Sequence, residues 1–78
     1  MTILEGIIKS LHNLGGKGYY QDIYDEYEKV TGIDLTTSKK AGIRACIERH
    51  SSDSKVFKGK NDLFYSIDGI GKGYWGLR

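Results

Sequence analysis

The last ten residues of the chain, GIGKGYWGLR at positions 69–78, bring together four glycines, one lysine and two aromatic side chains. From Gly71 to Gly76 their spacing matches G-x-G-x-x-G, the glycine pattern of nucleotide-binding loops. Such a loop holds a pyrophosphate only where it follows a strand and opens a helix. No helical pattern follows these glycines and no βαβ unit precedes them, so we interpret the stretch as the turn of a β-hairpin.

The glycines of residues 69–73 suit a turn because glycine adopts positive φ angles without steric cost. Lys72 would then stand at the exposed tip of the hairpin. Tyr74 and Trp75 follow as consecutive residues of the returning strand, and therefore point to opposite sides of it. We expect Trp75 to pack against helices. A hairpin loop that faces solvent and has no partner is the alternative interpretation.

Two short stretches before this turn are rich in aromatic and β-branched residues, as strands are. They are KVFKGKND at 55–62 and LFYSI at 63–67, separated by Gly59 and the pair Asn61-Asp62. The composition predicts extended chain in both stretches. Two or three short strands are equally compatible with the segment from Lys55 to Asp62.

Upstream of residue 51, apolar residues repeat at helical spacing in three places. The first helix is expected to begin at a capping box, Thr2–Glu5, and to end at Gly15-Gly16. A brief extended segment, KGYY at 17–20, leads into a second helix that ends at Gly32. The apolar faces are Ile3, Ile7, Leu11 and Leu14 in the first helix, and Ile23, Tyr24, Tyr27 and Val30 in the second.

The third predicted helix is TTSKKAGIRACIERHS at 36–51, with Thr36 or Thr37 as its N-cap. At about 100° per residue, its apolar residues gather on one side and its small, hydroxyl and basic residues on the other. The inward set is Ile43, Cys46, Ile47 and His50, and the outward set is Thr37, Lys40, Ala41, Arg44, Ala45 and Glu48. Such an outward face favours a polyanionic partner, with a merely solvated face as the alternative.

The charge of the chain is divided unevenly between its two parts. The 78 residues carry a formal net charge of only +2. Residues 1–34 hold three lysines against six carboxylates, a net charge of −3, whereas residues 35–78 hold nine basic residues against four carboxylates, a net charge of +5. This asymmetry predicts that a polyanion would meet one face of the molecule only.

Cys46 is the only cysteine, so no internal disulfide can form, as is typical of proteins from reducing compartments. No apolar run approaches the roughly 20 residues that span a membrane. The N-terminus lacks the basic start and the small-residue cleavage site of a signal peptide. We therefore expect a cytoplasmic chain without a membrane partner, folded as one small domain over residues 1–78.

Metal binding and catalysis find little support in the sequence. Cys46 and His50 lie four residues apart on one helical face, and His12 is the third candidate ligand. A closed zinc site needs four ligands and no further Cys or His remains, so a buried thiol and a packed histidine are favoured. No convergent acid, base and nucleophile is visible. The sequence therefore predicts neither a cofactor nor an enzyme.

Three helices, an outward face on the third and a glycine-tipped hairpin resemble the winged-helix domains of DNA-binding proteins. The stretches LHNLGGKGYYQDIYDEYEKVTG, ACIERHSSDS and DLFYSIDGIGKGYWGLR are similar to small winged-helix modules that accompany bacterial restriction endonucleases. Among such modules, the chain resembles the Mrr-type N-terminal domains and the HARE-type helix-turn-helix domains. The resemblance implies an α+β winged helix-turn-helix, with three helices followed by a C-terminal β-hairpin wing.

The resemblance also implies a non-catalytic module that binds double-stranded DNA and targets or regulates a restriction-type system. The third helix, about 36–50, would enter the major groove, and the wing, about 68–74, would contact the backbone. The residues carried over by position are Thr37, Ser38, Lys39, Lys40, Ala41, Arg44, Lys58, Lys60 and Lys72, with Lys39 nearer the edge. The alternative is a winged helix that binds another protein, such as a nuclease domain, through exposed aromatic residues or its acidic second helix. The acidic residues of that helix are Asp22, Asp25, Glu26 and Glu28.

Overall fold

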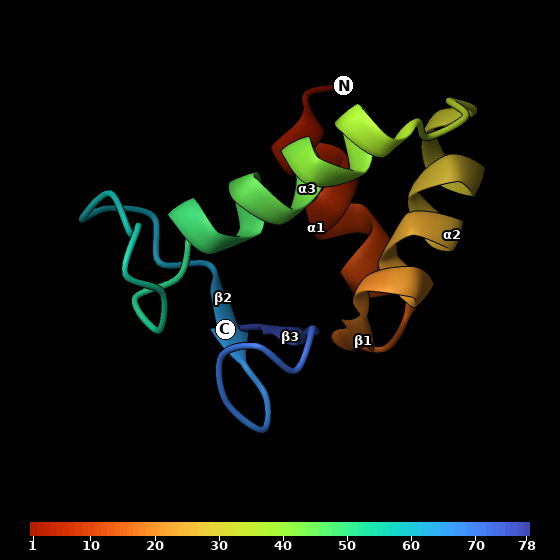
Figure 1. Cartoon of the computed structure of the whole chain (residues 1–78). Coiled ribbons are helices and arrows are strands. Elements are labelled where there is room, and N and C mark those ends of the chain that lie inside the picture. Colours follow the sequence, from red (N-terminus) through yellow and green to blue (C-terminus); the bar gives the residue numbers. More distant parts are fainter.

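Three helices and three short strands make up the computed structural model, which describes every residue from 1 to 78 (Figure 1). The helices gather on one side, and the strands with the loop between the last two lie on the other. The elements are α1 (Ile3–Asn13), β1 (Lys17–Tyr19), α2 (Tyr20–Thr31), α3 (Thr37–Arg49), β2 (Phe64–Ser66) and β3 (Tyr74–Leu77). None of the helices is long and apolar enough to cross a membrane.

Local signals in the sequence determine where the helices begin and end. The predicted capping box is confirmed, because the Glu5 N–H donates to the Thr2 hydroxyl at 3.1 Å and the Thr2 N–H donates to the Glu5 carboxylate at 2.8 Å. Gly32 ends α2 in the left-handed conformation, with a φ of 70°. Thr36 is the N-cap of α3, and its hydroxyl accepts from the Lys39 N–H.

The strands form one antiparallel sheet in the order β1-β3-β2, so the last strand of the chain is the central one. The extended segment expected after α1 is confirmed as β1. Its Gly18 lies opposite Trp75 and its Tyr19 lies opposite Tyr74. On the other side of β3, Phe64 pairs with Leu77. The sheet therefore joins the segment between α1 and α2 to the end of the chain.

The strand predicted between Lys55 and Asp62 is absent, and residues 51–63 form a loop of turns instead. Positive φ angles of 85° at Gly59 and 57° at Asn61 interrupt an extended chain. Hydrogen bonds to side chains replace the backbone hydrogen bonds of a strand in this loop. The Asp62 carboxylate accepts from the Ser52 N–H and from the Ser52 hydroxyl. Strand composition therefore gave the wrong prediction here, and only residues 64–66 of the second stretch form a strand.

Arg78 fastens this loop to the sheet. Its Nε atom donates to the Asp62 carboxylate at 2.9 Å and to the Phe64 carbonyl at 2.8 Å. The same guanidinium lies 3.4 Å from the Asp53 carboxylate. Hydrogen bonds from Ser52, with smaller contributions from Arg78, lower the pKa of Asp62 below its usual value. The ionised form of Asp62 is thus the one that holds the loop.

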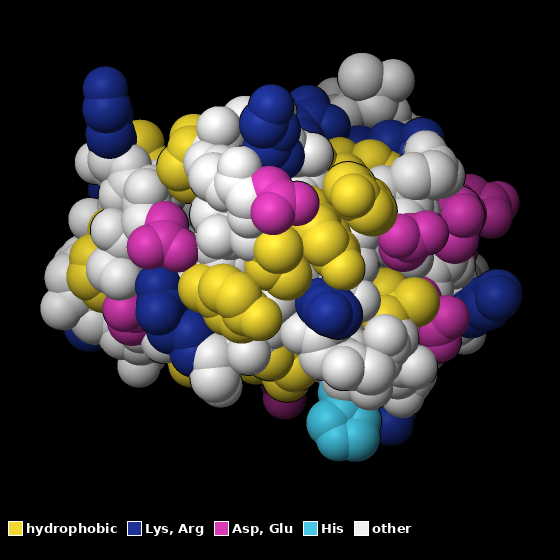
Figure 2. Space-filling model, turned by 90° about the horizontal axis from the view of Figure 1, so that it is seen from below, with side chains coloured by type: hydrophobic (Ala, Val, Ile, Leu, Met, Phe, Trp, Pro, Cys, Tyr) yellow, Lys and Arg dark blue, Asp and Glu magenta, His cyan; other side chains and the backbone are white.

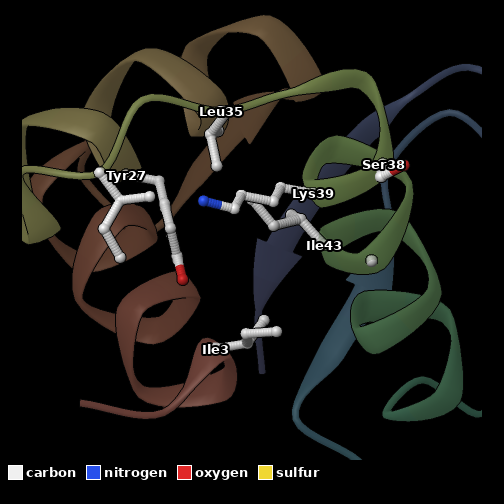
Figure 3. A pocket seen from close by; sticks show the side chains of 8 residues that line it. Ile3, Tyr27, Leu35, Ser38, Lys39 and Ile43 are labelled. Atoms are coloured by element: carbon white, nitrogen blue, oxygen red, sulfur yellow. The ribbon is translucent and has the colours of Figure 1, made fainter.

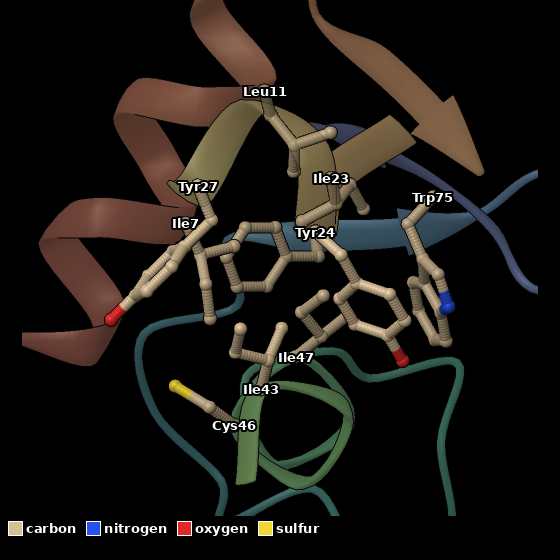
Figure 4. Packing of buried hydrophobic residues seen from close by; sticks show 10 residues of the cluster. Ile7, Leu11, Ile23, Tyr24, Tyr27, Ile43, Cys46, Ile47 and Trp75 are labelled. Atoms are coloured by element: carbon tan, nitrogen blue, oxygen red, sulfur yellow. The ribbon is translucent and has the colours of Figure 1, made fainter. Parts of the chain in front are cut away.

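All three helices and two of the strands contribute to one core of ten buried residues (Figure 4). The predicted inward side of α3 is confirmed, since Ile43, Cys46 and Ile47 are buried. Trp75 is also confirmed in the core, packed with side chains from the helices. The complete cluster is Ile7, Leu11, Ile23, Tyr24, Tyr27, Ile43, Cys46, Ile47, Phe64 and Trp75.

Two helical glycines give a matched test of this packing. A Cβ atom added at Gly6 would lie 2.5 Å from Cε2 of the buried Tyr27 ring, whereas one added at Gly42 would meet nothing within 4 Å. Replacing glycine by alanine inside a helix favours folding by about 0.5–1 kcal/mol, because the unfolded chain loses freedom. We expect Gly42→Ala to gain that amount in free energy of unfolding, and Gly6→Ala to lose about 1–3 kcal/mol through overpacking. Urea unfolding of both variants measures the difference, and changes of equal sign would contradict this packing.

We expect the 51–63 loop to lose its hydrogen bonds to Asp62 at acidic pH. Because the folded-state pKa of Asp62 is lowered, its contribution to stability is present above the unfolded value of about 4 and is lost as pH falls through the folded value. We therefore expect Asp62→Asn to be less stable than the wild type at neutral pH, and the gap to close in acid. Urea unfolding at both pH values, with amide exchange at Ser52, measures this. A gap that is independent of pH would show that the carboxylate charge does not hold the loop.

Candidate functional site

The outward side of α3 carries small and polar side chains over its whole length. Thr37, Ser38 and Ala41 are exposed, and Arg44 and Ala45 are half-buried. The small side chains leave the helix backbone close to the surface, so a large partner can approach it closely. The predicted outward face is therefore accessible, and its two flanks differ in what they contact.

One flank of α3 rests on Tyr24 of α2. Nη1 of Arg44 donates to the Tyr24 hydroxyl at 2.9 Å, and Nζ of Lys40 lies 5.4 Å from the centre of the Tyr24 ring. The hydrogen bond to Tyr24 raises the pKa of Arg44, so the guanidinium stays charged. Tyr24 itself is buried in the core at 7% exposure. The buried tyrosine thus orients both cations. Because the two long side chains are already ordered, they lose less conformational entropy when a partner binds.

The same flank forms a groove with the loop that connects β2 to β3. The walls of this α3–loop groove are Arg44 and Glu48 of α3, Tyr20 of α2, Trp75, and residues 70–73 of the loop. Lys72, at the exposed tip of the loop, therefore lines the same groove as Arg44. Glu48 adds one carboxylate to it, so the groove is not uniformly positive.

Tyr20 fixes the base of the loop. Its N–H donates to the Gly73 carbonyl at 2.9 Å, and a Cβ atom at Gly73 would lie only 3.1 Å from the Tyr20 ring. Gly73 also has a φ of 69°, so glycine satisfies both the close approach and the left-handed backbone. Burial raises the pKa of Tyr20 to about 12. Its hydroxyl is consequently neutral and adds no negative charge to the groove.

Lys58 lies beside the C-terminal half of α3, next to the α3–loop groove. It lines a shallow hollow with Val56 and with Ala45, Glu48 and Arg49 of α3. The Lys58 N–H donates to the Arg49 carbonyl, which places the 51–63 loop against the helix end. Because Glu48 lines both hollows, Lys72 and Lys58 lie in neighbouring hollows on the two sides of the Glu48 side chain.

Two of the predicted lysines lie apart from this arrangement. Lys60 is exposed on the 51–63 loop and lines neither hollow. Lys39 lies on the flank of α3 opposite Arg44, where it lines an apolar groove with Tyr27 and Leu35 (Figure 3). Both ion pairs of the molecule belong to Arg78, so none of the predicted cations is neutralised by a carboxylate.

The side chains considered for metal binding have other partners. Nδ1 of His50 lies 2.7 Å from the Cys46 carbonyl oxygen, and Sγ of Cys46 lies 3.9 Å from the same nitrogen. Burial raises the pKa of the Cys46 thiol, so the thiolate is disfavoured. His12 is exposed at the end of α1. No group of three or more His, Cys, Asp and Glu side chains is arranged to hold a metal ion.

The acidic side chains of α2 are engaged in local hydrogen bonds. Asp22 accepts from the Tyr19 N–H at the start of the helix, and Glu28 accepts from the Leu35 N–H in the α2–α3 loop. Asp25 and Glu26 accept from the side-chain amides of Gln21 and Asn13. These contacts cap α2 and join it to its neighbours, which gives the acidic cluster a structural role.

The outer face of the sheet is aromatic. Tyr19 and Tyr74 stack with ring centres 4.2 Å apart, and Tyr65 lies across Gly76, where a Cβ atom would come within 2.5 Å of its ring. Figure 2 views the molecule from the side of the strands, and hydrophobic side chains gather in the middle of this face with Lys and Arg side chains nearby. Tyr74 thus points away from the core, opposite to Trp75, as predicted for consecutive strand residues.

No protein-family model matches the chain, and no curated protein or solved structure shows significant similarity to it. Any functional assignment therefore rests on the residues of the chain itself.

Sequence reasoning missed Tyr24 as a part of the site. The spacing of apolar residues places Tyr24 on the buried face of α2, which is correct for its ring. Its hydroxyl, however, accepts a hydrogen bond from Arg44, twenty positions along the chain. A tyrosine placed where phenylalanine would pack equally well is the one available signal, because a buried hydroxyl needs a partner.

Removing the Tyr24 hydroxyl should release Arg44. We expect Tyr24→Phe to cost about 0.5–1.5 kcal/mol of unfolding free energy for one hydrogen bond. The Arg44 side chain should also become more mobile, as measured by the heteronuclear NOE at its Nε atom. Tyr27→Phe is the matched control, since Tyr27 is equally buried and makes no hydrogen bond to Arg44. An Arg44 whose mobility is unchanged in Tyr24→Phe would argue against its orientation by Tyr24.

Proposed function

We propose that the chain is a winged helix-turn-helix module that binds double-stranded DNA and catalyses no reaction. The element order supports this, because β1 falls between the first two helices and pairs with the strand that ends the hairpin. In this proposal α3 is the recognition helix and the β2–β3 loop, residues 67–73, is the wing.

One observation carries the proposal: unpaired cations from three separate segments surround the outward side of α3. Arg44 comes from the helix, Lys72 from the wing and Lys58 from the 51–63 loop, and the last two line neighbouring hollows that share Glu48. A rod of phosphates lying along α3 would meet both of these hollows at once. Each lysine or arginine that neutralises a phosphate releases counterions, which is the main source of non-specific affinity for DNA.

The surface between these cations suits a major groove. Thr37, Ser38 and Ala41 are exposed near the start of α3 and would face the base edges. Hydroxyls donate to or accept from any base, and the alanine methyl suits the methyl group of thymine. Lys40 and Arg44, held against Tyr24, would reach guanine or the phosphates beside it. Glu48, which lines both hollows, opposes tight non-specific binding.

The resemblance to winged-helix modules of restriction endonucleases supports the biological part of the proposal. A module of this kind would bring a partner domain to DNA, or regulate it, in a bacterial restriction-type system. Its place would then be the cytoplasm, where the DNA lies. The chain's own residues supply binding and positioning, and the chemistry would belong to the partner domain.

A second candidate function is the binding of another protein. It is favoured by the apolar groove on the opposite flank of α3, which phosphates would not fill. The two functions predict different responses to salt, since phosphate binding weakens steeply with ionic strength and apolar contacts respond little.

Titration with a fluorescent random duplex at several salt concentrations tests DNA binding. We expect the logarithm of the binding constant to fall linearly with the logarithm of salt concentration. Arg44→Ala, Lys58→Ala and Lys72→Ala should each weaken binding and reduce the slope by about 0.9, the share of one phosphate contact. Lys9→Ala, on the exposed side of α1, is the charge-matched control and should leave the slope unchanged.

Amide shifts of the ¹⁵N-labelled chain, titrated with the same duplex without its fluorophore, locate the interface. They should cluster at residues 36–45 and 69–74. A salt-independent affinity, an equal loss in Lys9→Ala, or shifts confined to α2 would contradict the DNA proposal.

A further inference from the structure

An apolar groove lies between the N-terminal end of α1, the α2–α3 loop and the flank of α3 that faces away from Arg44 (Figure 3). Its volume is about 350 Å³, at the small end of the range for binding sites. Two of its side chains are unusually exposed for their type, Ile3 at 49% and Ile33 at 42%. The apolar lining is Ile3, Tyr27, Ile33, Leu35, Gly42 and Ile43.

Gly42 keeps this groove open. It lies inside α3, where a glycine disfavours the helix by about 0.5–1 kcal/mol relative to alanine. Neither its backbone nor its surroundings require glycine, since its φ is not positive and an added Cβ atom would meet nothing within 4 Å. Any larger side chain at this position would enter the groove. The glycine thus costs stability and leaves room for an occupant.

Lys39 indicates the charge of that occupant. In Figure 3 its side chain extends across the groove toward Tyr27 and Leu35, and no carboxylate lies within ion-pair distance of it. The Glu28 carboxylate accepts from the Leu35 N–H at 2.8 Å and forms no ion pair. An ammonium group above an apolar lining is complementary to a carboxylate that is attached to an apolar group.

We propose that this groove docks an amphipathic, acidic segment of a partner protein. One or two leucine-like side chains of the segment would enter between Ile3, Ile33 and Gly42, and a neighbouring aspartate or glutamate would pair with Lys39. This is the mode in which an apolar helix face lies in a hydrophobic groove. The site lies on the other flank of α3 from Arg44 and Lys72, so the module would hold DNA and a partner protein at the same time. The inference does not depend on the DNA proposal.

A pair of synthetic peptides tests the inference. The first is an amidated 14-residue helix with leucines at three- and four-residue spacing and glutamates beside them, and the second has glutamine in place of every glutamate. Titration of the ¹⁵N-labelled chain should shift the amides of residues 33–43 and of Ile3. The glutamate peptide should bind about three- to tenfold more tightly, because a charged hydrogen bond is available to it alone.

Three variants assign the effect to the groove. Lys39→Met keeps the apolar stem, and should reduce binding of the glutamate peptide to that of the glutamine peptide. Gly42→Leu should block both peptides while the spectrum stays dispersed, because the new side chain has room in the fold. Lys9→Met, on the exposed side of α1, is the control and should change nothing.

Several results would overturn the inference. These are equal affinities of the two peptides for the wild type, a preference that survives Lys39→Met, or the absence of groove shifts at millimolar peptide. Shifts of the same amides on simple dilution of the free chain would show that a second copy fills the groove instead. None of these results concerns Arg44 or Lys72. The DNA proposal is therefore tested independently, by the duplex titration.

Discussion

The antiparallel pairing of β1 with β3 is the constraint on which the remaining structure depends. Three residues that follow α1 hold the final strand of the chain in the centre of the sheet. Trp75 lies opposite Gly18 and its indole is buried in the helical core, while a Cβ atom at Gly18 would lie 3.0 Å from Cδ1 of Leu14. Tyr20, the first residue of α2, then binds the Gly73 carbonyl. The position of the β2–β3 loop relative to α3 thus follows from a strand of three residues.

That placement gives α3 two unlike flanks. On one flank, Tyr24 orients Lys40 and Arg44 beside the loop that carries Lys72. On the other flank, Lys39 crosses an apolar groove. Consecutive lysines at 39 and 40 lie 100° apart on the helix and therefore serve different surfaces. In our proposals one surface meets phosphates and the other meets an acidic segment of a protein, so a single helix would connect DNA with a partner.

The parts of the fold that sequence reasoning predicted are those determined over three or four residues. The Thr2–Glu5 capping box, the end of α2 at Gly32 and the inward side of α3 all follow from local spacing. The contacts that were missed join residues 20 and 16 positions apart, Arg44 with Tyr24 and Arg78 with Asp62. The wrongly predicted strand at 55–62 has the composition of a strand, but positive φ angles at Gly59 and Asn61 interrupt it. The Asp62 carboxylate also accepts a hydrogen bond from the Ser52 N–H, in place of a partner strand. For the proposed DNA interface, residue types follow from the sequence, and only the fold shows which flank of α3 each residue occupies.

The brevity of the two outer strands has a consequence for how the protein behaves at high concentration. β1 and β2 have three residues each, and β1 passes directly into α2. An unpaired strand edge is a template on which another chain can add, and its danger grows with its length. Here neither edge offers more than a few free backbone groups, although the face between them is rich in tyrosine. The fold therefore displays an aromatic sheet without presenting an edge long enough to seed the stacking of one molecule on the next.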